Sequence, residues 1–228
     1  MSGSSRGEQE AGANERRHPI PGRMAAVILA GGAARRLGGR PKPWLAVDGV
    51  PLVLRVLDAA AAANPRIVVG ALELVPLLPK GVSLTQESQA GAGPLAALAT
   101  GLRLLRVARP GTVAVLASDL PLLTREVVAQ LRAAASKPDV DGAVLVDEDG
   151  DRQWLAGVWR YAALVGAMPE DPANLGLRSS LSGLRIADVA VPTGQPWFDC
   201  DTEADLNGAA ALVRDADTPT TRGEPDAG

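Results

Sequence analysis

Uninterrupted apolar strands alternate with helical patterns along the middle of the chain, and this alternation restricts the fold. Met24–Ala30 (MAAVILA) and Thr112–Ala117 (TVAVLA) are apolar without a break, which is typical of strands that helices cover on both faces. When such strands alternate with helices, the pattern predicts an α/β fold on a parallel sheet. We therefore expect a three-layer α/β/α sandwich with a mostly parallel, Rossmann-like sheet.

The other elements are predicted from apolar periodicity and from signals for helix starts. Pro51 suits the first turn of a helix, and Thr124 suits an N-cap. The remaining predicted strands are 66–70, 82–85, 141–146, 155–159 and 183–191, and the predicted helices are 51–63, 93–107, 124–135 and 202–213. Residues 1–23 and 215–228 are polar and aperiodic, so we expect disordered tails around a single domain at 24–214.

Histidine and cysteine are scarce, and this limits the chemistry. The one histidine, His18, lies in the polar leader, and the one cysteine, Cys200, excludes an internal disulfide. The predicted domain therefore has no Ser-His-Asp triad, no Cys-His pair and no His/Cys zinc site. Any reaction must use carboxylates, lysine, arginine, backbone amides and a hard metal ion.

Charge and hydropathy bound the partners and the compartment. A net charge of −3 and a pI near 5.3 argue against non-specific binding of nucleic acid, which needs a basic face. No apolar run approaches the roughly 20 residues of a membrane span, and the leader has no apolar core of a secretory signal. We expect a cytoplasmic protein that binds neither nucleic acid nor membrane.

A glycine-rich loop, Gly31–Pro43, follows the first strand, where open α/β sheets bind ligands. Its four glycines permit close approach of the backbone and can expose N–H groups to an anion. Arg35, Arg36 and Lys42 add cations that suit phosphate. The patterns G-x-G-x-x-G and G-x-x-x-x-G-K-[ST] are both absent. The alternative is a flexible loop with solvated arginines.

Two groups of aspartates follow later strands or precede the last helix. Asp119 comes directly after the strand 112–117 and suits Mg²⁺, which prefers oxygen ligands; the alternative is a turn former or N-cap. Asp199 and Asp201 are two apart, so in an extended segment they face the same side. Either they aim at one ion, with Asp201 the favoured ligand, or they merely cap the last helix. Thr202 and Asp205 have the spacing of a capping box.

These motifs together resemble one family. The run L-A-G-G-x-x-x-R-x-G-G-x-x-K ending at Lys42, the aspartate–proline turn at Asp119 and the run D-x-D-T-x-x-D-L from Asp199 resemble the MobA-like nucleotidyltransferases, the molybdenum cofactor guanylyltransferases. The resemblance runs from Met24 to about Val213. It implies a single nucleotidyltransferase domain of the nucleotide-diphospho-sugar transferase type.

The resemblance also implies roles for individual residues. It assigns catalysis to Lys42, Arg36 and Asp119, and Mg²⁺ binding to Asp119 and Asp201, with Asp199 in support. The nucleotide-binding set that it implies is Leu29, Ala30, Gly31, Gly32, Arg36, Lys42, Glu87, Gly93 and Asp119. Glu87 would accept hydrogen bonds from guanine, or it is a solvated loop glutamate.

Two positions depart from the family pattern. Pro41 stands where the guanylyltransferases commonly have an acidic residue, and the second strand ends in Val69-Gly70-Ala71, where they often have asparagine near the base. Arg152 and Gln153 occupy the stretch on the acceptor side.

The function implied is Mg²⁺-dependent transfer of a nucleotide, GMP from GTP being favoured, to a phosphorylated small molecule, with release of pyrophosphate. The implied acceptor is molybdopterin. The alternatives are a cytidylyl- or sugar-phosphate nucleotidyltransferase of the same fold, or a nucleotide-binding regulator without turnover. The oligomeric state does not follow from the sequence.

Overall fold

Seven strands form the central sheet of the computed structural model, which describes residues 20–31, 42–87, 89 and 91–217. They run in the order β5-β4-β1-β6-β8-β7-β9. Their bounds are β1 Ile20–Ala30, β4 Arg66–Gly70, β5 Val82–Thr85, β6 Pro110–Ala117, β7 Gly142–Val146, β8 Arg152–Arg160 and β9 Ile186–Ala190. Only β8 is antiparallel to its neighbours β6 and β7 among these strands. The prediction of a mostly parallel sheet is confirmed.

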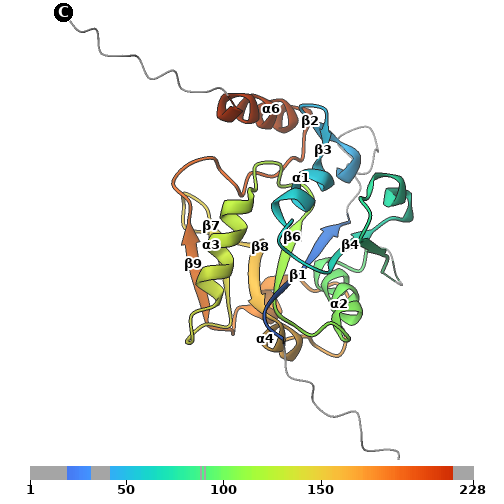
Figure 1. Cartoon of the computed structure of the whole chain (residues 1–228), viewed down its shortest axis with the longest axis vertical. Helices are drawn as coiled ribbons and strands as arrows, with labels where there is room; N and C mark the ends of the chain where they lie inside the picture. The colour runs from blue at the N-terminus through green and yellow to red at the C-terminus, as the bar shows by residue number, and fades with distance from the viewer. Residues whose placement is uncertain (1–19, 32–41, 88, 90, 218–228) are drawn as a thin grey trace, which may run out of the picture.

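Helices and a small hairpin surround this sheet (Figure 1). The helices are α1 Leu52–Ala59, α2 Pro94–Leu105, α3 Arg125–Ala135, α4 Tyr161–Gly166, α5 Leu177–Leu181 and α6 Glu203–Asp217. Two 3₁₀ helices, η1 Lys42–Trp44 and η2 Leu72–Leu77, and the hairpin β2 Ala46–Val47 with β3 Val50–Pro51 complete the described elements. Thr124 caps α3 as predicted, because its hydroxyl accepts a hydrogen bond from the amide of Val127.

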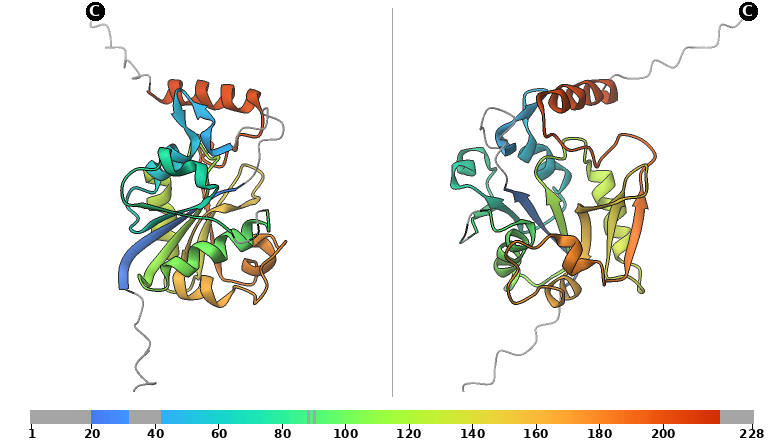
Figure 2. Two further views of the ribbon diagram at one scale, coloured as in Figure 1. Left: turned by 90° about the vertical axis from the view of Figure 1, so that its right-hand side faces the viewer. Right: turned by 180° about the vertical axis from the view of Figure 1, so that it is seen from behind.

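Strand β1 shows why its sequence is apolar at every position. Ala26 and Ile28 belong to the core that contains the buried faces of α1 and α3. Val27 and Leu29 belong to a second core, on the other face, with α2, α4 and α5. Successive side chains of a strand point to opposite faces, so a strand between two helical layers is apolar throughout. Figure 2 shows helices on both sides of the sheet.

A third, smaller core attaches the last helix. Leu45, Val47, Cys200 and Ala209 are buried together where α6 packs over the β2–β3 hairpin (Figure 1). Burial is the largest cause that raises the pKa of the Cys200 thiol, to about 12. The prediction that Cys200 is a small core residue is confirmed.

Several predicted boundaries are wrong. The helix expected at 51–63 ends at Ala59. After it, the chain turns toward β1, where the amide of Asn64 donates to the carbonyl of Met24 at 2.8 Å and the carbonyl of Pro65 accepts from the amide of Ala26 at 3.0 Å. The alanines at 60–63 favour helix, but this return of the chain overrides their propensity.

The structured domain extends beyond its predicted limits of 24 and 214. Strand β1 begins at Ile20, which pairs with Pro110 of β6, and a guanidinium nitrogen of Arg132 donates to the carbonyl of Gly22. Helix α6 continues to Asp217. The other residues assigned to the two tails lie outside the described part. The hairpin, η2, α4 and α5 were not predicted, and β8 is longer than the expected 155–159.

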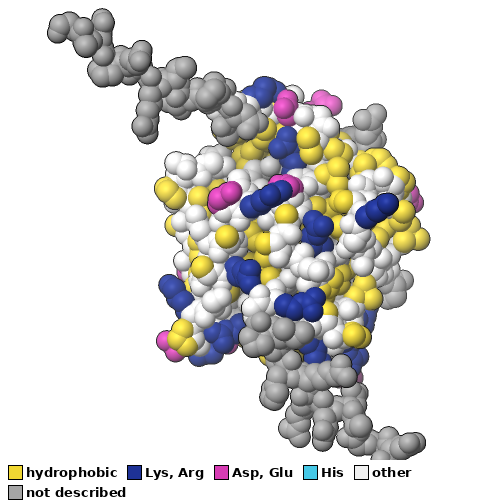
Figure 3. All heavy atoms as spheres, viewed as in Figure 1, with side chains coloured by type: hydrophobic (Ala, Val, Ile, Leu, Met, Phe, Trp, Pro, Cys, Tyr) yellow, Lys and Arg dark blue, Asp and Glu magenta, His cyan; other side chains and the backbone are white. Residues whose placement is uncertain are grey.

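The surface in Figure 3 carries its Lys and Arg side chains in scattered positions among apolar and neutral groups. On that face they do not form one continuous basic stripe. In the part of the chain that the structure describes, no helix combines the length and the apolar character needed to cross a membrane.

Candidate active site

The sheet order places a crevice at the carboxyl ends of β1 and β6. From β1 the chain continues to β4 on one side, and it returns later to β6 on the other side of β1. Ligands of open α/β sheets bind where the strand order reverses in this way. The amide of Ser118 donates to the carbonyl of Leu29 at 3.0 Å. This bond continues the pairing of β6 with β1 and brings Asp119 to the end of β1.

A cavity of about 400 Å³ opens at this crevice. Its described lining is Leu29, Gly31, Glu87, Gly91, Gly93, Pro94, Ala97, Ala117, Asp119 and Leu155. Five residues of the predicted nucleotide-binding set are among them, from the ends of two strands and the segment before α2. Ala30 is buried in β1 and packs in the core on the α1 and α3 side. Gly32 and Arg36 lie outside the described residues.

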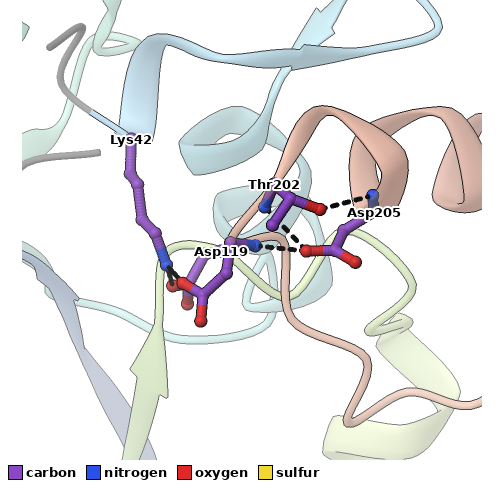
Figure 4. A network of polar contacts seen from close by, with 5 residues as sticks. Lys42, Asp119, Thr202 and Asp205 are labelled. Atoms are coloured by element: carbon purple, nitrogen blue, oxygen red, sulfur yellow. Dashed lines mark hydrogen bonds and ion pairs between the residues drawn. The ribbon is translucent and has the colours of Figure 1, made fainter. Parts of the chain in front are cut away.

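Lys42 brings two of the predicted aspartates together. Its ammonium lies 3.0 Å from Oδ2 of Asp119 and also contacts a carboxylate oxygen of Asp201. Figure 4 shows the lysine side chain reaching from the start of η1 onto the carboxylate of Asp119. The Lys42 side chain is only 15% exposed. Residues separated by 77 and 159 positions therefore share one charged cluster at the cavity.

Burial and neighbouring charges shift the pKa values of Lys42 and of the nearby Asp199. Burial lowers the pKa of Lys42, but hydrogen bonds and attraction from Asp201 and Asp119 outweigh it, so the net pKa is raised. Desolvation raises the pKa of Asp199, and repulsion from Asp201 and Asp119 adds to that effect. Of Asp199 and Asp201, it is Asp201 that contacts the ammonium of Lys42. Asp199 is close enough for the charges of the cluster to act on it.

The start of α6 holds Asp201 in place. One carboxylate oxygen of Asp205 accepts hydrogen bonds from the amides of Asp201 and Thr202, at 2.9 and 2.7 Å. The Thr202 hydroxyl accepts one from the amide of Asp205 at 3.2 Å (Figure 4). The predicted capping box is confirmed. Because Thr202 and Asp205 form it, the carboxylate of Asp201 stays available to Lys42, and the alternative that Asp201 merely caps the helix is wrong.

The donor set fits a divalent cation. Within the described residues, no three His, Cys, Asp or Glu side chains gather into a metal-binding group. Asp119 and Asp201 nevertheless converge on the ammonium of Lys42, which marks a place where a cation is held. Mg²⁺ typically takes one or two carboxylates, together with water and substrate phosphates. Two converging carboxylates beside an open cavity match that requirement, and the Mg²⁺ site itself stays a prediction.

Glu87 presents an unused acceptor in the lining of the same cavity. Its Oε2 atom is buried, and no residue of the described chain hydrogen-bonds to it. Burial raises the pKa of Glu87, although a hydrogen bond from the amide of Ala92 acts against it. A buried acceptor without a partner is costly, so this oxygen suits a ligand with N–H donors better than the alternative of a solvated loop glutamate.

Comparison with known proteins places the chain in a family. Residues 26–189 match the MobA-like NTP transferase domain. A probable molybdenum cofactor guanylyltransferase from Mycobacterium ulcerans is 31% identical over 80% of this chain and 91% of its own length. A molybdenum cofactor guanylyltransferase from Bradyrhizobium sp. is 30% identical over 85% and 93%. The chain belongs to the MobA-like NTP transferase family.

A solved structure agrees with the fold of this MobA-like domain. The molybdopterin-guanine dinucleotide biosynthesis protein A from Archaeoglobus fulgidus superposes with a TM-score of 0.64 at 20% identity, over 84% of this chain and all of that one. The sheet of β1 and β4 to β9 is therefore the nucleotidyltransferase fold predicted from the motifs.

Gly70, at the end of β4, packs closely against the end of β1. A Cβ atom at this position would lie 2.8 Å from the carbonyl oxygen of Ala30 and 3.0 Å from the side chain of Leu74. The backbone around Gly70 thus leaves no room for a side chain at this position. The packing of β4 against β1 therefore requires glycine here.

Sequence reasoning missed Leu155, which lines the cavity from β8. The register of β7 against β8 shifts here, because Val144 pairs with Gly157 while Leu145 pairs with Gln153. Such irregularities redirect side chains beside active sites. No local pattern in the sequence predicts a register shift of this kind. Gly91 also lines the cavity without having been predicted, although it lies close to the predicted Gly93.

The two residues predicted on the acceptor side have other partners. Arg152 donates to Asp188 of β9 at 2.6 Å. Gln153 donates to a carboxylate oxygen of Asp147 at 2.8 Å. Neither is part of the described cavity lining, so their contact with an acceptor stays a prediction.

A larger cavity, of about 560 Å³, lies between α1, α3 and α6. Its walls include Leu54, Leu122 and Leu212. Two of its charged residues, Arg125 and Asp58, form an exposed ion pair with each other. This cavity lacks the combination of strand ends, glycines and converging carboxylates found at the crevice.

Proposed function

We propose that this protein transfers the GMP of GTP to the phosphate group of molybdopterin, with release of pyrophosphate and with Mg²⁺ as cofactor. The observation that carries the proposal is the meeting of Lys42, Asp119 and Asp201 beside the cavity at the sheet's switch point. Two relatives named as molybdenum cofactor guanylyltransferases, each matched over most of its length, support the choice of base and acceptor.

The reaction is an in-line displacement at the α-phosphorus of the nucleotide. An acceptor phosphate oxygen forms the new bond to phosphorus, and the bond from phosphorus to the bridging oxygen of the β-phosphate breaks. Pyrophosphate leaves with that electron pair. A phosphate monoester is already anionic near neutral pH, so no general base is needed. This agrees with a described domain that contains no histidine.

The protein's contribution is alignment and charge. Leu29, Gly31 and Gly93 bring backbone close to the cavity, where the nucleotide would be held in a fixed orientation. Lys42 supplies a positive charge toward phosphate oxygens, a role that the motif also predicts for Arg36. Asp119 and Asp201 would hold the metal ion, which when bound would neutralise charge on the phosphates.

Glu87 is assigned to the base. Guanine presents an N1–H group and an amino group side by side, and both are donors that a carboxylate can accept. The buried, unpartnered Oε2 of Glu87 supports this assignment. A second candidate nucleotide is CTP, because the stretch Val69-Gly70-Ala71 lacks the asparagine that the guanylyltransferases often carry near the base.

Release of pyrophosphate measures the proposed function directly. Purified protein with Mg²⁺ and molybdopterin is incubated separately with GTP, ITP, CTP, ATP and UTP. We expect the highest kcat/KM with GTP. ITP lacks the amino group, and the loss of one hydrogen bond of about 1.5 kcal/mol to the charged Glu87 would reduce kcat/KM about tenfold.

Other outcomes would decide against parts of the proposal. A preference for CTP would establish the second candidate and remove Glu87 as a guanine reader. If the protein binds GTP tightly but releases no pyrophosphate with the same active preparation of molybdopterin, this would indicate a nucleotide-binding regulator.

A further inference from the structure

We propose that Lys42 occupies the place of the divalent cation in the nucleotide-free protein, so that metal binds well only when a nucleoside triphosphate arrives to take over the lysine. This inference rests on the proposed function, because it assigns an order of binding to the same site. It goes beyond that function by giving Lys42 two successive partners.

The geometry of the cluster is the first argument. The ammonium of Lys42 contacts both carboxylates that would hold the metal, Asp119 and Asp201, at the same time. A divalent ion bound between these oxygens of Asp119 and Asp201 would lie next to the ammonium of Lys42. Two positive charges in contact repel each other strongly where water is partly excluded. Lysine and metal therefore compete for one place.

The exposure of the three side chains is the second argument. Lys42 is 15% exposed and Asp119 20%, whereas Asp201 is 52% exposed. A lysine that leaves the carboxylates within this sheltered site would lose its counter-charges and gain only partial hydration. The free protein therefore keeps Lys42 on the aspartates, and metal alone has to displace it at a cost.

A triphosphate removes that cost. Lysine carries its charge on a flexible four-carbon stem, and the cavity that would hold the phosphates shares Asp119 with the cluster. Phosphate oxygens offer Lys42 new negative partners while they supply further ligands to the metal. The carboxylates then pass from the lysine to the metal, and binding of metal and of nucleotide becomes mutually favourable.

Binding of Mn²⁺ to the nucleotide-free protein tests this order. Mn²⁺ replaces Mg²⁺ because its free form gives an electron paramagnetic resonance signal that disappears on binding. We expect Lys42→Met to bind Mn²⁺ about tenfold more tightly than the original protein, equivalent to about 1.4 kcal/mol. Lys42→Gln should show the same gain, and thermal unfolding of both variants checks that they are folded.

Two controls locate the effect. Arg125→Met removes one positive charge from the ion pair with Asp58, away from the cluster, and should leave Mn²⁺ binding unchanged. Asp119→Asn combined with Lys42→Met should cancel the gain. If folded Lys42→Met and Lys42→Gln bind Mn²⁺ no better than the original protein, the inference is overturned.

The proposed function can fail separately from this inference. Pyrophosphate release by the original protein, with no gain in Mn²⁺ affinity for Lys42→Met, would leave the function standing and remove the order of binding. A gain in affinity without any turnover would leave the lysine's place established and overturn the proposed reaction.

Discussion

Two groups of charged side chains lie at opposite ends of the sheet and differ in their balance of charge. Where β7 and β9 begin, Asp141 and Arg185 form a one-to-one pair. The Arg185 side chain donates to both carboxylate oxygens, at 2.8 and 3.0 Å, and its amide donates as well. Where β1 and β6 end, one ammonium, that of Lys42, serves both Asp119 and Asp201.

The difference separates a contact that stabilises the fold from a cluster that can bind a ligand. The charge of Asp141 is balanced by Arg185, so this pair has no excess charge with which to bind another molecule. Among the described residues, the cluster around Lys42 has more negative than positive charge, and Asp199 adds to that excess. Such an excess costs stability, and perturbed carboxylates in a cleft are typical of functional sites. Exchanging single carboxylates at the two ends tests this contrast.

The largest effect is expected from Asp119→Asn. Loss of this carboxylate should lower kcat/KM for pyrophosphate release about 10²- to 10³-fold, the scale for removing one preorganised charge contact at a transition state. The melting temperature should stay the same or rise, because repulsion between neighbouring carboxylates is reduced. The backbone bond from the amide of Cys200 to the carbonyl of Asp119 remains.

The matched variant is Asp141→Asn at the opposite end of the sheet. It should lower the melting temperature and leave kcat/KM unchanged. If Asp141→Asn reduced turnover as much as Asp119→Asn did in folded protein, the distinction between the two ends would be lost.

A smaller effect separates Asp201 from Asp199. Asp201 contacts Lys42 directly, whereas Asp199 influences the cluster through its charge. We expect Asp201→Asn to reduce kcat/KM about tenfold more than Asp199→Asn does, a difference of about 1.4 kcal/mol at the barrier. The ratio of the two rate constants, measured at saturating Mg²⁺, is the test. Equal losses, or a larger one for Asp199→Asn, would make Asp199 the principal second ligand.

The positions of the charged residues after strands explain how much of the site could be predicted from the sequence. Asp119 directly follows one apolar strand, and Lys42 lies near the end of the glycine-rich loop that follows another apolar strand. Carboxyl ends of parallel strands meet at one edge of a sheet, so both residues could be placed at one crevice in advance. The fold followed in the same way from strands that are apolar on both faces.

The rest depends on contacts that no local pattern encodes. Leu155 reaches the cavity through an irregularity of register in β8. The contact of Lys42 with Asp201 depends on how the cap at Asp205 holds the backbone. The double contact of Lys42 joins segments 159 residues apart. Each is a tertiary outcome, so spacing alone left it open.

The smallest effect is a dependence of stability on pH at the balanced pair. Hydrogen bonds from the Arg185 side chain, then from its amide, hold the pKa of Asp141 below its ordinary value of 3.8, at about 2. A carboxyl group whose pKa is lower in the folded protein stabilises it above the unfolded pKa, and this contribution is lost as pH falls through the folded pKa. Denaturant unfolding of the original protein and of Asp141→Asn should therefore show a gap in stability that is constant above about pH 4 and narrows toward pH 2. Other carboxyl groups titrate in both proteins alike, so the gap isolates Asp141. A gap that stayed constant down to pH 2 would mean that Arg185 does not depress this pKa, and the contrast between the two ends of the sheet would then rest on geometry alone.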